Sequence, residues 1–369
     1  MTAAGAPRPH PAPPRHRSGK INGMSDRQNV PDLPADVDWS AFAIVAVDLD
    51  GTAAGPDGRV SPEGLRALQA AEQSGLHPVI VTGRALPAAM GVWLRAGLSR
   101  PVIACGGALV TWPTAGRALR ERPLDPAVVD RALQCARDLD LIPFLYGASS
   151  IVTDRRSTWR DRLAHLNEIP IAVHPAAERD AGAGLPPGGP AAAPAPVPAP
   201  ETAPASAPAD PPAGDPPVPA VPAEAGAGPG GLAAWHRGHV YKVVLATDPE
   251  RAGAVRPAVE EGLRGLEACC VATLPGLLEI VRPDATKEAA LEDLCRMLGV
   301  PRQRVMAIGD GENDLGMIRW AGFGVAMANA RPEVRAAARL VIGHHAEEGV
   351  ARFLQAVVAR RAERRGEGG

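Results

Sequence analysis

Short apolar runs alternate with segments of helical spacing along most of the chain. A run without polar interruption, such as 42–47, is typical of a strand buried on both faces of a parallel sheet. Strands that alternate with helices predict an α/β fold with a doubly wound parallel sheet. The expected strands are 42–47, 78–81, 102–104, two short ones in 143–152, 240–246, 277–281 and 305–308. The expected helices are 62–74, 126–139, 249–266 and 285–298.

Composition excludes several classes of function. The 369 residues leave room for two domains, and a hydrophobic content of 46% allows a large core. A net charge of −2 with 3% aromatic residues argues against nucleic-acid binding. No apolar run reaches the roughly 18 residues of a membrane span. The five cysteines form no Cys-x-x-Cys pair, so we expect reduced thiols and a cytoplasmic protein.

Two segments are expected to remain outside the folded domains. Residues 1–36 are rich in Pro, Ala and Arg and predict a disordered tail, within which Met24 is an alternative start. Residues 185–230 contain 16 prolines and no aromatic residue, Lys or Arg. Such a segment buries too little apolar surface to offset its ordering entropy, so it predicts a linker over about 181–232.

Two acids at one strand end indicate a functional site. Asp48 and Asp50 directly follow the run 42–47, and ligands of open α/β sheets bind beyond such strand ends. In extended backbone both carboxylates can point to the same side. Two acids so close repel each other, and they are stable together with a cation or a shared proton. An ordinary surface turn is the alternative reading of Asp-Leu-Asp-Gly.

Polar residues follow other strands in the same way. Four stretches match, in order, the motifs of a known superfamily: "DLDGT" at 48–52, "VTGR" at 81–84, "TKEAAL" at 286–291 and "GDGENDLGMI" at 309–318. Two flanking stretches, "YKVVLATDPE" and "AMANARPEVRAAA", also fit. Over roughly 42–175 and 238–355 the chain resembles the haloacid dehalogenase superfamily, and within it the Cof-like phosphatases.

The resemblance implies a domain organisation. A Rossmann-like core would consist of 37–111 and 276–369, and an inserted smaller α/β cap domain of 112–275, with the Pro/Ala-rich linker inside the cap. The cap would close over the core, exclude water and select the leaving group.

The resemblance also implies roles for individual residues. Asp48 would attack the phosphoryl group and form an aspartyl-phosphate. Asp50 would be the general acid and base, because repulsion between the two acids raises one pKa and leaves a protonated Asp50 available. The implied phosphate-binding residues are Leu49, Thr82, Gly83, Lys287 and Asn313. The implied ligands of Mg²⁺ are Asp48, Asp50 through its carbonyl, Asp310 and Asp314.

Three positions depart from the family pattern. Gly106 stands where most relatives have Asn, Glu288 where Gly follows the lysine, and His345 where Asn is common. We expect these positions to affect substrate choice more than reaction type. His344, His345, His236 and His239 are read as loop residues rather than metal ligands.

The sequence thus predicts a Mg²⁺-dependent phosphatase for a small phosphorylated metabolite, such as a sugar phosphate. We expect a monomer or weak dimer with no nucleic-acid or membrane partner. A phosphomutase on the same core is one alternative, and isomerisation without phosphate release would reveal it. A catalytically inactive binding protein that uses the Pro-rich segment is the other.

Overall fold

The computed structural model describes residues 33–113, 117–173 and 239–367. The predicted linker, His236 and almost all of the predicted N-terminal tail lie outside these ranges. Among the described residues, no helix combines the length and the apolar character needed to cross a membrane.

The main sheet is parallel. In the described ranges it has five strands in the order β14-β13-β12-β1-β2. At the centre, Val47 of β1 lies opposite Ile308 of β12 and Ile80 of β2. The strand bounds are β1 Ile44–Val47, β2 His77–Ile80, β12 Val305–Gly309, β13 Phe323–Met327 and β14 Leu340–Ile342. The predicted parallel α/β sheet is confirmed.

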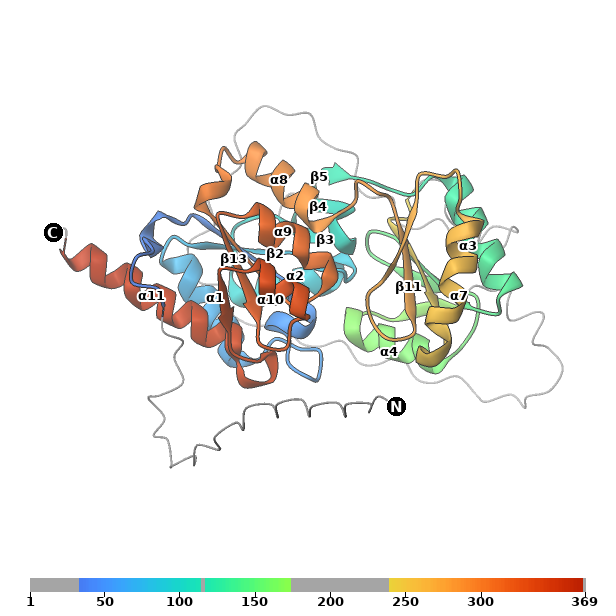
Figure 1. Cartoon of the computed structure of the whole chain (residues 1–369), viewed down its shortest axis with the longest axis horizontal. Helices are drawn as coiled ribbons and strands as arrows, with labels where there is room; N and C mark the ends of the chain where they lie inside the picture. Colours follow the sequence, from blue (N-terminus) through green and yellow to red (C-terminus); the bar gives the residue numbers. More distant parts are fainter. Residues whose placement is uncertain (1–32, 114–116, 174–238, 368–369) are drawn as a thin grey trace, which may run out of the picture. The chain divides into compact units, whose positions relative to one another are not determined.

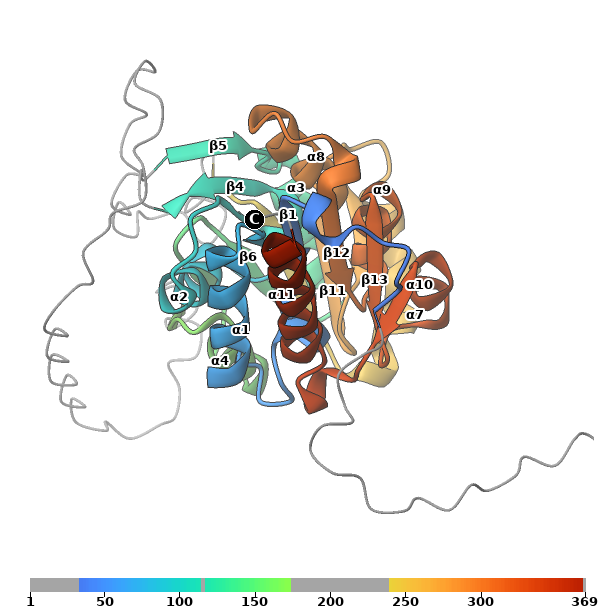
Figure 2. The same cartoon turned by 90° about the vertical axis from the view of Figure 1, so that its left-hand side faces the viewer.

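Helices cover both faces of this sheet because β1 is apolar on both sides. Val45 and Val47 pack with α1 (Pro62–Gln73), α2 (Leu86–Ala96) and α11 (Gly349–Glu367). Ile44 and Ala46 pack on the other face, with α8 (Lys287–Met297) and α9 (Leu315–Trp320). Figure 2 shows α1 and α11 side by side in front of the sheet. The short helix α10 (Pro332–Ala337) follows β13.

A second sheet forms the predicted cap. Its order, within the residues described, is β10-β11-β9-β6-β7-β8. The strand bounds are β6 Ile142–Tyr146, β7 Ile151–Thr153, β8 Ile171–Val173, β9 Lys242–Ala246, β10 Cys269–Ala272 and β11 Leu277–Val281. Helices α3 (Pro126–Asp138) and α7 (Pro249–Gly262) pack together beside it (Figure 1). β11 pairs with β9 and β10, so the predicted boundary after residue 275 falls inside this sheet.

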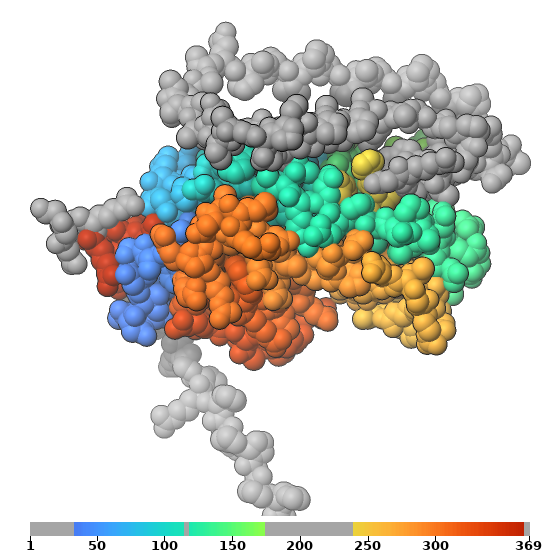
Figure 3. All heavy atoms as spheres, turned by 90° about the horizontal axis from the view of Figure 1, so that it is seen from above, coloured from blue at the N-terminus to red at the C-terminus, as the bar shows by residue number. Residues whose placement is uncertain are grey.

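A smaller sheet links the two regions. β3 (Val102–Ala104), β4 (Leu109–Trp112) and β5 (Arg117–Glu121) are antiparallel neighbours among the described residues. In Figure 3 the teal residues that include this sheet lie beside the orange residues that include α8. Arg120 of β5 donates to Asp293 of α8 over 2.7 Å. The predicted boundary between residues 111 and 112 therefore falls at the end of β4, within this hairpin.

Candidate active site

The turn after β1 presents Asp48 and Asp50 at the carboxyl edge of the main sheet. Asp50 keeps an extended backbone, and Gly51 turns the chain with φ +74°. A side chain at Gly51 would also overlap the carboxylate of Asp310. The close approach and the left-handed conformation both require glycine here.

Lys287 joins two of the predicted site residues. Its Nζ lies 2.5 Å from Asp48 Oδ1 and 2.7 Å from Asp314 Oδ1. All three side chains are buried. Burial raises the pKa of Asp48 well above its usual value, and Asp314 adds to this while Lys287 opposes it. Burial acts to lower the pKa of Lys287, but Asp314 and Asp48 outweigh it and the pKa rises.

Asp48, Asp310 and Asp314 form a cluster suited to a hard cation. One carboxylate oxygen from each lies within 4.8 Å of the others. Asp314 is fixed by the backbone amides of Asp310 and Gly311, which donate over 3.1 and 2.9 Å. Burial and the charge of Asp314 raise the pKa of Asp310 to about 6. The three carboxylates repel one another, and their oxygens are the kind of ligand that Mg²⁺ prefers, so the cluster fits this cation.

Asp50 has a partner that the sequence argument missed. Arg84, the last residue of "VTGR", donates to Asp50 Oδ1 over 2.6 Å and to Oδ2 over 3.0 Å. Its Nη2 also donates to the carbonyl of Gly58 over 2.7 Å. Of the two acids, Asp48 is the buried one and faces Lys287. Asp50 instead faces a buried guanidinium, which orients its carboxylate.

The predicted phosphate-binding residues lie on several loops of the same edge. Gly83 and Asn313 line a cavity of about 120 Å³ together with Asp48 and Lys287. Thr82 is buried, and its Oγ1 accepts from the amide of Arg84 over 3.1 Å. The Leu49 side chain packs in the core beneath the turn.

Asn329 is a second residue that sequence reasoning missed as a site residue. Its Nδ2 donates to the carbonyl of Gly51 over 2.7 Å and to Asp310 over 3.3 Å. The amide of His345 donates to Asn329 over 3.1 Å, and His345 Nδ1 lies 3.0 Å from the carbonyl of Ala54. His345, the first residue of the 3-10 turn η7 (His345–Glu347), therefore connects the turn after β1 to the loop that carries Asn329. Asn329 lies in the family-like stretch "AMANARPEVRAAA", and this resemblance could have indicated it as a site residue.

The other departures from the family pattern have local explanations. Gly106 has φ +70°, a left-handed conformation that Asn and Gly tolerate better than other residues. Glu288 lies in the first turn of α8 and packs over Gly316. An acidic residue is favourable at a helix N-terminus.

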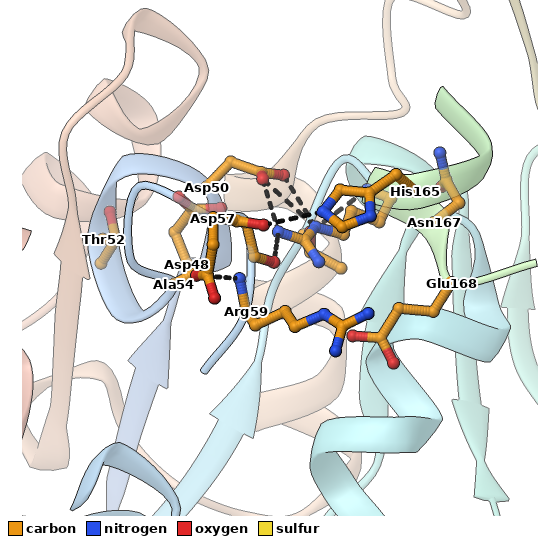
Figure 4. A network of polar contacts seen from close by, with 12 residues as sticks. Asp48, Asp50, Thr52, Ala54, Asp57, Arg59, His165, Asn167 and Glu168 are labelled. Atoms are coloured by element: carbon orange, nitrogen blue, oxygen red, sulfur yellow. Dashed lines mark hydrogen bonds and ion pairs between the residues drawn. The ribbon is translucent and has the colours of Figure 1, made fainter. Parts of the chain in front are cut away.

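The second sheet also contributes to the cavity. Its lining includes Tyr146, Lys242 and Glu279 from β6, β9 and β11. Figure 4 shows His165, Asn167 and Glu168, from the end of α4 (Thr158–Asn167) and the residue after it, opposite the turn that carries Asp48 and Asp50. The cavity is therefore bounded by the core on one side and by the predicted cap on the other.

Comparison with known proteins supports the resemblance to haloacid dehalogenase-like hydrolases. The family model of haloacid dehalogenase-like hydrolases matches residues 45–179 and 235–354. Phosphatase YwpJ of Bacillus subtilis is 24% identical over 85% of this chain and 98% of its own length. Pyridoxal phosphate phosphatase YbhA of Escherichia coli is 26% identical over 84% of this chain and 97% of its own length.

Another relative matches over a shorter region. A 5-amino-6-(5-phospho-D-ribitylamino)uracil phosphatase, YitU of Bacillus subtilis, is 40% identical over 21% of this chain. The match spans 29% of that relative's length. A solved haloacid dehalogenase-like hydrolase from Bacteroides thetaiotaomicron shares the fold, with a TM-score of 0.64, 22% identity, and coverage of 86% of this chain and 99% of that one. The chain belongs to the family of haloacid dehalogenase-like hydrolases.

Proposed function

We propose that the protein is a Mg²⁺-dependent phosphatase that hydrolyses a small phosphorylated metabolite. The observation that carries this proposal is a cluster at the carboxyl edge of the sheet, in which the half-buried Asp310 lies beside the buried Asp48, Lys287 and Asp314. A nucleophilic carboxylate, a cation that neutralises it and oxygen ligands for a metal are what phosphoryl transfer requires. The similarity to phosphatase YwpJ and to pyridoxal phosphate phosphatase YbhA is consistent with this.

In the first half-reaction, Asp48 attacks phosphorus and its Oδ–P bond forms while the bond to the leaving oxygen breaks. Asp50 supplies the proton that the leaving oxygen takes up, which requires its carboxyl group to be protonated and turned away from Arg84 when substrate is bound. Lys287 offsets the negative charge of Asp48 and holds its carboxylate in place. Mg²⁺ held by Asp48, Asp310, Asp314 and the Asp50 carbonyl would neutralise charge on the phosphoryl group.

In the second half-reaction, water attacks the phosphorus of the aspartyl-phosphate. Asp50 takes a proton from that water, the Asp48 Oδ–P bond breaks, and inorganic phosphate leaves. Backbone amides at Leu49 and Gly83, with Thr82, Lys287 and Asn313, are the proposed donors to the phosphoryl oxygens. We further propose a cytoplasmic location, which fits five free cysteines.

A phosphate-release assay over a panel of phosphorylated metabolites tests the proposal. Activity is expected to require added Mg²⁺ and to disappear with EDTA. Asp48→Asn should lower turnover at least about 10³-fold because the nucleophile is lost. The matched change Asp138→Asn, at an exposed carboxylate on α3, should leave turnover unchanged. Full activity in EDTA, or in Asp48→Asn, would rule out the proposed chemistry.

A further inference from the structure

One face of the second sheet points toward the active site and carries charge. Side chains alternate along the strands, so Leu145, Val243 and Leu245 pack among α3 and α7. The opposite face contains Phe144, Val244 and Leu277 in a separate apolar cluster with Leu163 of α4. The charged residues on this second face are Lys242 and Glu279, which line the cavity over Asp48.

Lys242 and Glu279 form a buried ion pair. Lys242 is 2% exposed, and its Nζ donates to Glu279 Oε1 over 2.9 Å. The same ammonium lies 4.5 Å from the centre of the Tyr146 ring. Thr273 Oγ1 donates to Glu279 Oε1 over 3.0 Å. The pair is thus held rigidly from three strands and the loop between β10 and β11.

The pair borders the space in which the phosphoryl group is expected to bind. Lys242 Nζ lies 3.9 Å from the position that a Cβ on Gly83 would take. Gly83 belongs to the loop after β2 that is proposed to bind phosphate. A substrate whose phosphoryl group lies beside Asp48 would therefore place its leaving group against Lys242 and Glu279.

Fold stability gives little reason for this pair. Burying two charges costs desolvation energy, and apolar residues of similar volume often stabilise a protein as much or more. Leu163, Leu166, Leu274 and Leu277 surround the same cavity, so an apolar environment was available. A charged pair held at the wall of a cavity is better explained by recognition of a polar ligand.

We propose that Lys242 and Glu279 select the leaving group of the substrate by hydrogen bonding to its hydroxyl groups. The inference rests on the proposed phosphatase function. An ammonium and a carboxylate side by side offer a donor and an acceptor, and hydroxyl groups on adjacent carbons can satisfy both. A cationic leaving group would be repelled by Lys242 and an anionic one by Glu279. The favoured leaving group is therefore a neutral polyol.

The test compares substrates that differ in the leaving group. The parent and the double variant Lys242→Met/Glu279→Gln are assayed with glycerol 3-phosphate, ribose 5-phosphate, glucose 6-phosphate and p-nitrophenyl phosphate, whose leaving group has no further hydroxyl. The double variant removes both charges together, so neither is left buried without a partner. For the best polyol phosphate, kcat/KM should fall about 10- to 100-fold, and for p-nitrophenyl phosphate less than about threefold.

A second pair on the same domain provides the control. Arg256→Met/Glu260→Gln likewise removes both charges of an ion pair, here the exposed pair of α7, and should alter kcat/KM for neither kind of substrate. An equal loss for both kinds of substrate in the Lys242/Glu279 variant would mean a structural role and would overturn the inference. The inference would also be overturned if the parent hydrolysed p-nitrophenyl phosphate but no polyol phosphate. A parent that hydrolyses no phosphate ester in Mg²⁺ would instead refute the phosphatase function itself.

Discussion

Asp48 and Asp50 are two residues apart in the chain but have different surroundings. Asp48 is buried against Lys287, which also bridges to Asp314. Asp50 is about one-third exposed and paired with Arg84. This asymmetry suits the proposed division of labour, in which one acid is a fixed nucleophile and the other reaches toward the leaving oxygen.

The predicted acid–base role of Asp50 can be tested by Asp50→Asn. This variant should retain substrate binding but hydrolyse an alkyl phosphate about 10²- to 10⁴-fold more slowly. With p-nitrophenyl phosphate the acid role matters less, so phosphate should accumulate on Asp48. Mass spectrometry of the intact protein would then show about 80 Da of added mass, the covalent intermediate. Turnover of the alkyl phosphate at the parent rate would show that another group moves the proton.

At the scale of elements, the connection after β3 positions the helix that supplies Lys287. Gly106 and Gly107 both have positive φ, at +70° and +105°. A Cβ at Gly106 would meet no atom within 4 Å, but one at Gly107 would overlap the carbonyl of Thr286 and lie 2.9 Å from the amide of Lys287. Thr286 caps α8 by accepting from the amide of Ala289. The backbone at Gly107 thus packs directly on the start of α8.

Gly107→Ala should therefore do more damage than Gly106→Ala. Both variants carry the conformational cost of a left-handed residue, about 1 kcal/mol or more. Gly107→Ala must also displace the N-terminus of α8, which should move Lys287 and lower kcat. Urea unfolding and steady-state kinetics on the two variants measure both effects. Equal losses of stability and of kcat in the two variants would contradict this role for the close approach.

At the scale of the whole molecule, α4 of the second domain contacts the core around the cavity. Asn167 Oδ1 accepts from the amide of Ala85 over 2.7 Å, just before α2 begins. His165 Nε2 lies 2.9 Å from the carbonyl of Asp57, and Arg95 pairs with Glu168 over 3.5 Å. Asn167 is 2% exposed, so its hydrogen bond is made away from water. These contacts hold the cap over the site.

Removal of the buried hydrogen bond between Asn167 and Ala85 should weaken closure of the cap over the core. Asn167→Ala leaves the amide of Ala85 without its partner, a cost of about 1–3 kcal/mol. We expect kcat/KM to fall by about 10-fold. The factor should be similar for different leaving groups, because the Asn167 side chain acts on closure of the cap and not on the leaving group. Glu168→Gln, which breaks the neighbouring exposed pair, should cost less than about 1 kcal/mol. Comparable effects of the two changes on kcat/KM would refute the special role of Asn167.

Local pattern in the sequence was enough to predict the α/β class and the parallel sheet. It also predicted the strand ends that carry Asp48 and Asp310, and the helix that begins near Lys287. These features depend on apolar periodicity and on the Asp-x-Asp-Gly turn, which are properties of neighbouring residues. The antiparallel β4–β5 hairpin and the place of β11 in the second sheet were not predicted, because strand pairing is decided by distant partners.

Tertiary structure alone decided which charges meet. Arg84 lies 34 residues from Asp50, and Lys242 lies 37 residues from Glu279. Asn329 reaches Gly51 across 278 residues. No local periodicity encodes such pairs, because they form only when separate strand ends and two domains are brought to one cavity. The strand ends that carry Asp48, Asp50 and Asp310 could therefore be predicted from the chain, while the partners of these residues and the second-domain side chains that line the cavity depended on the fold.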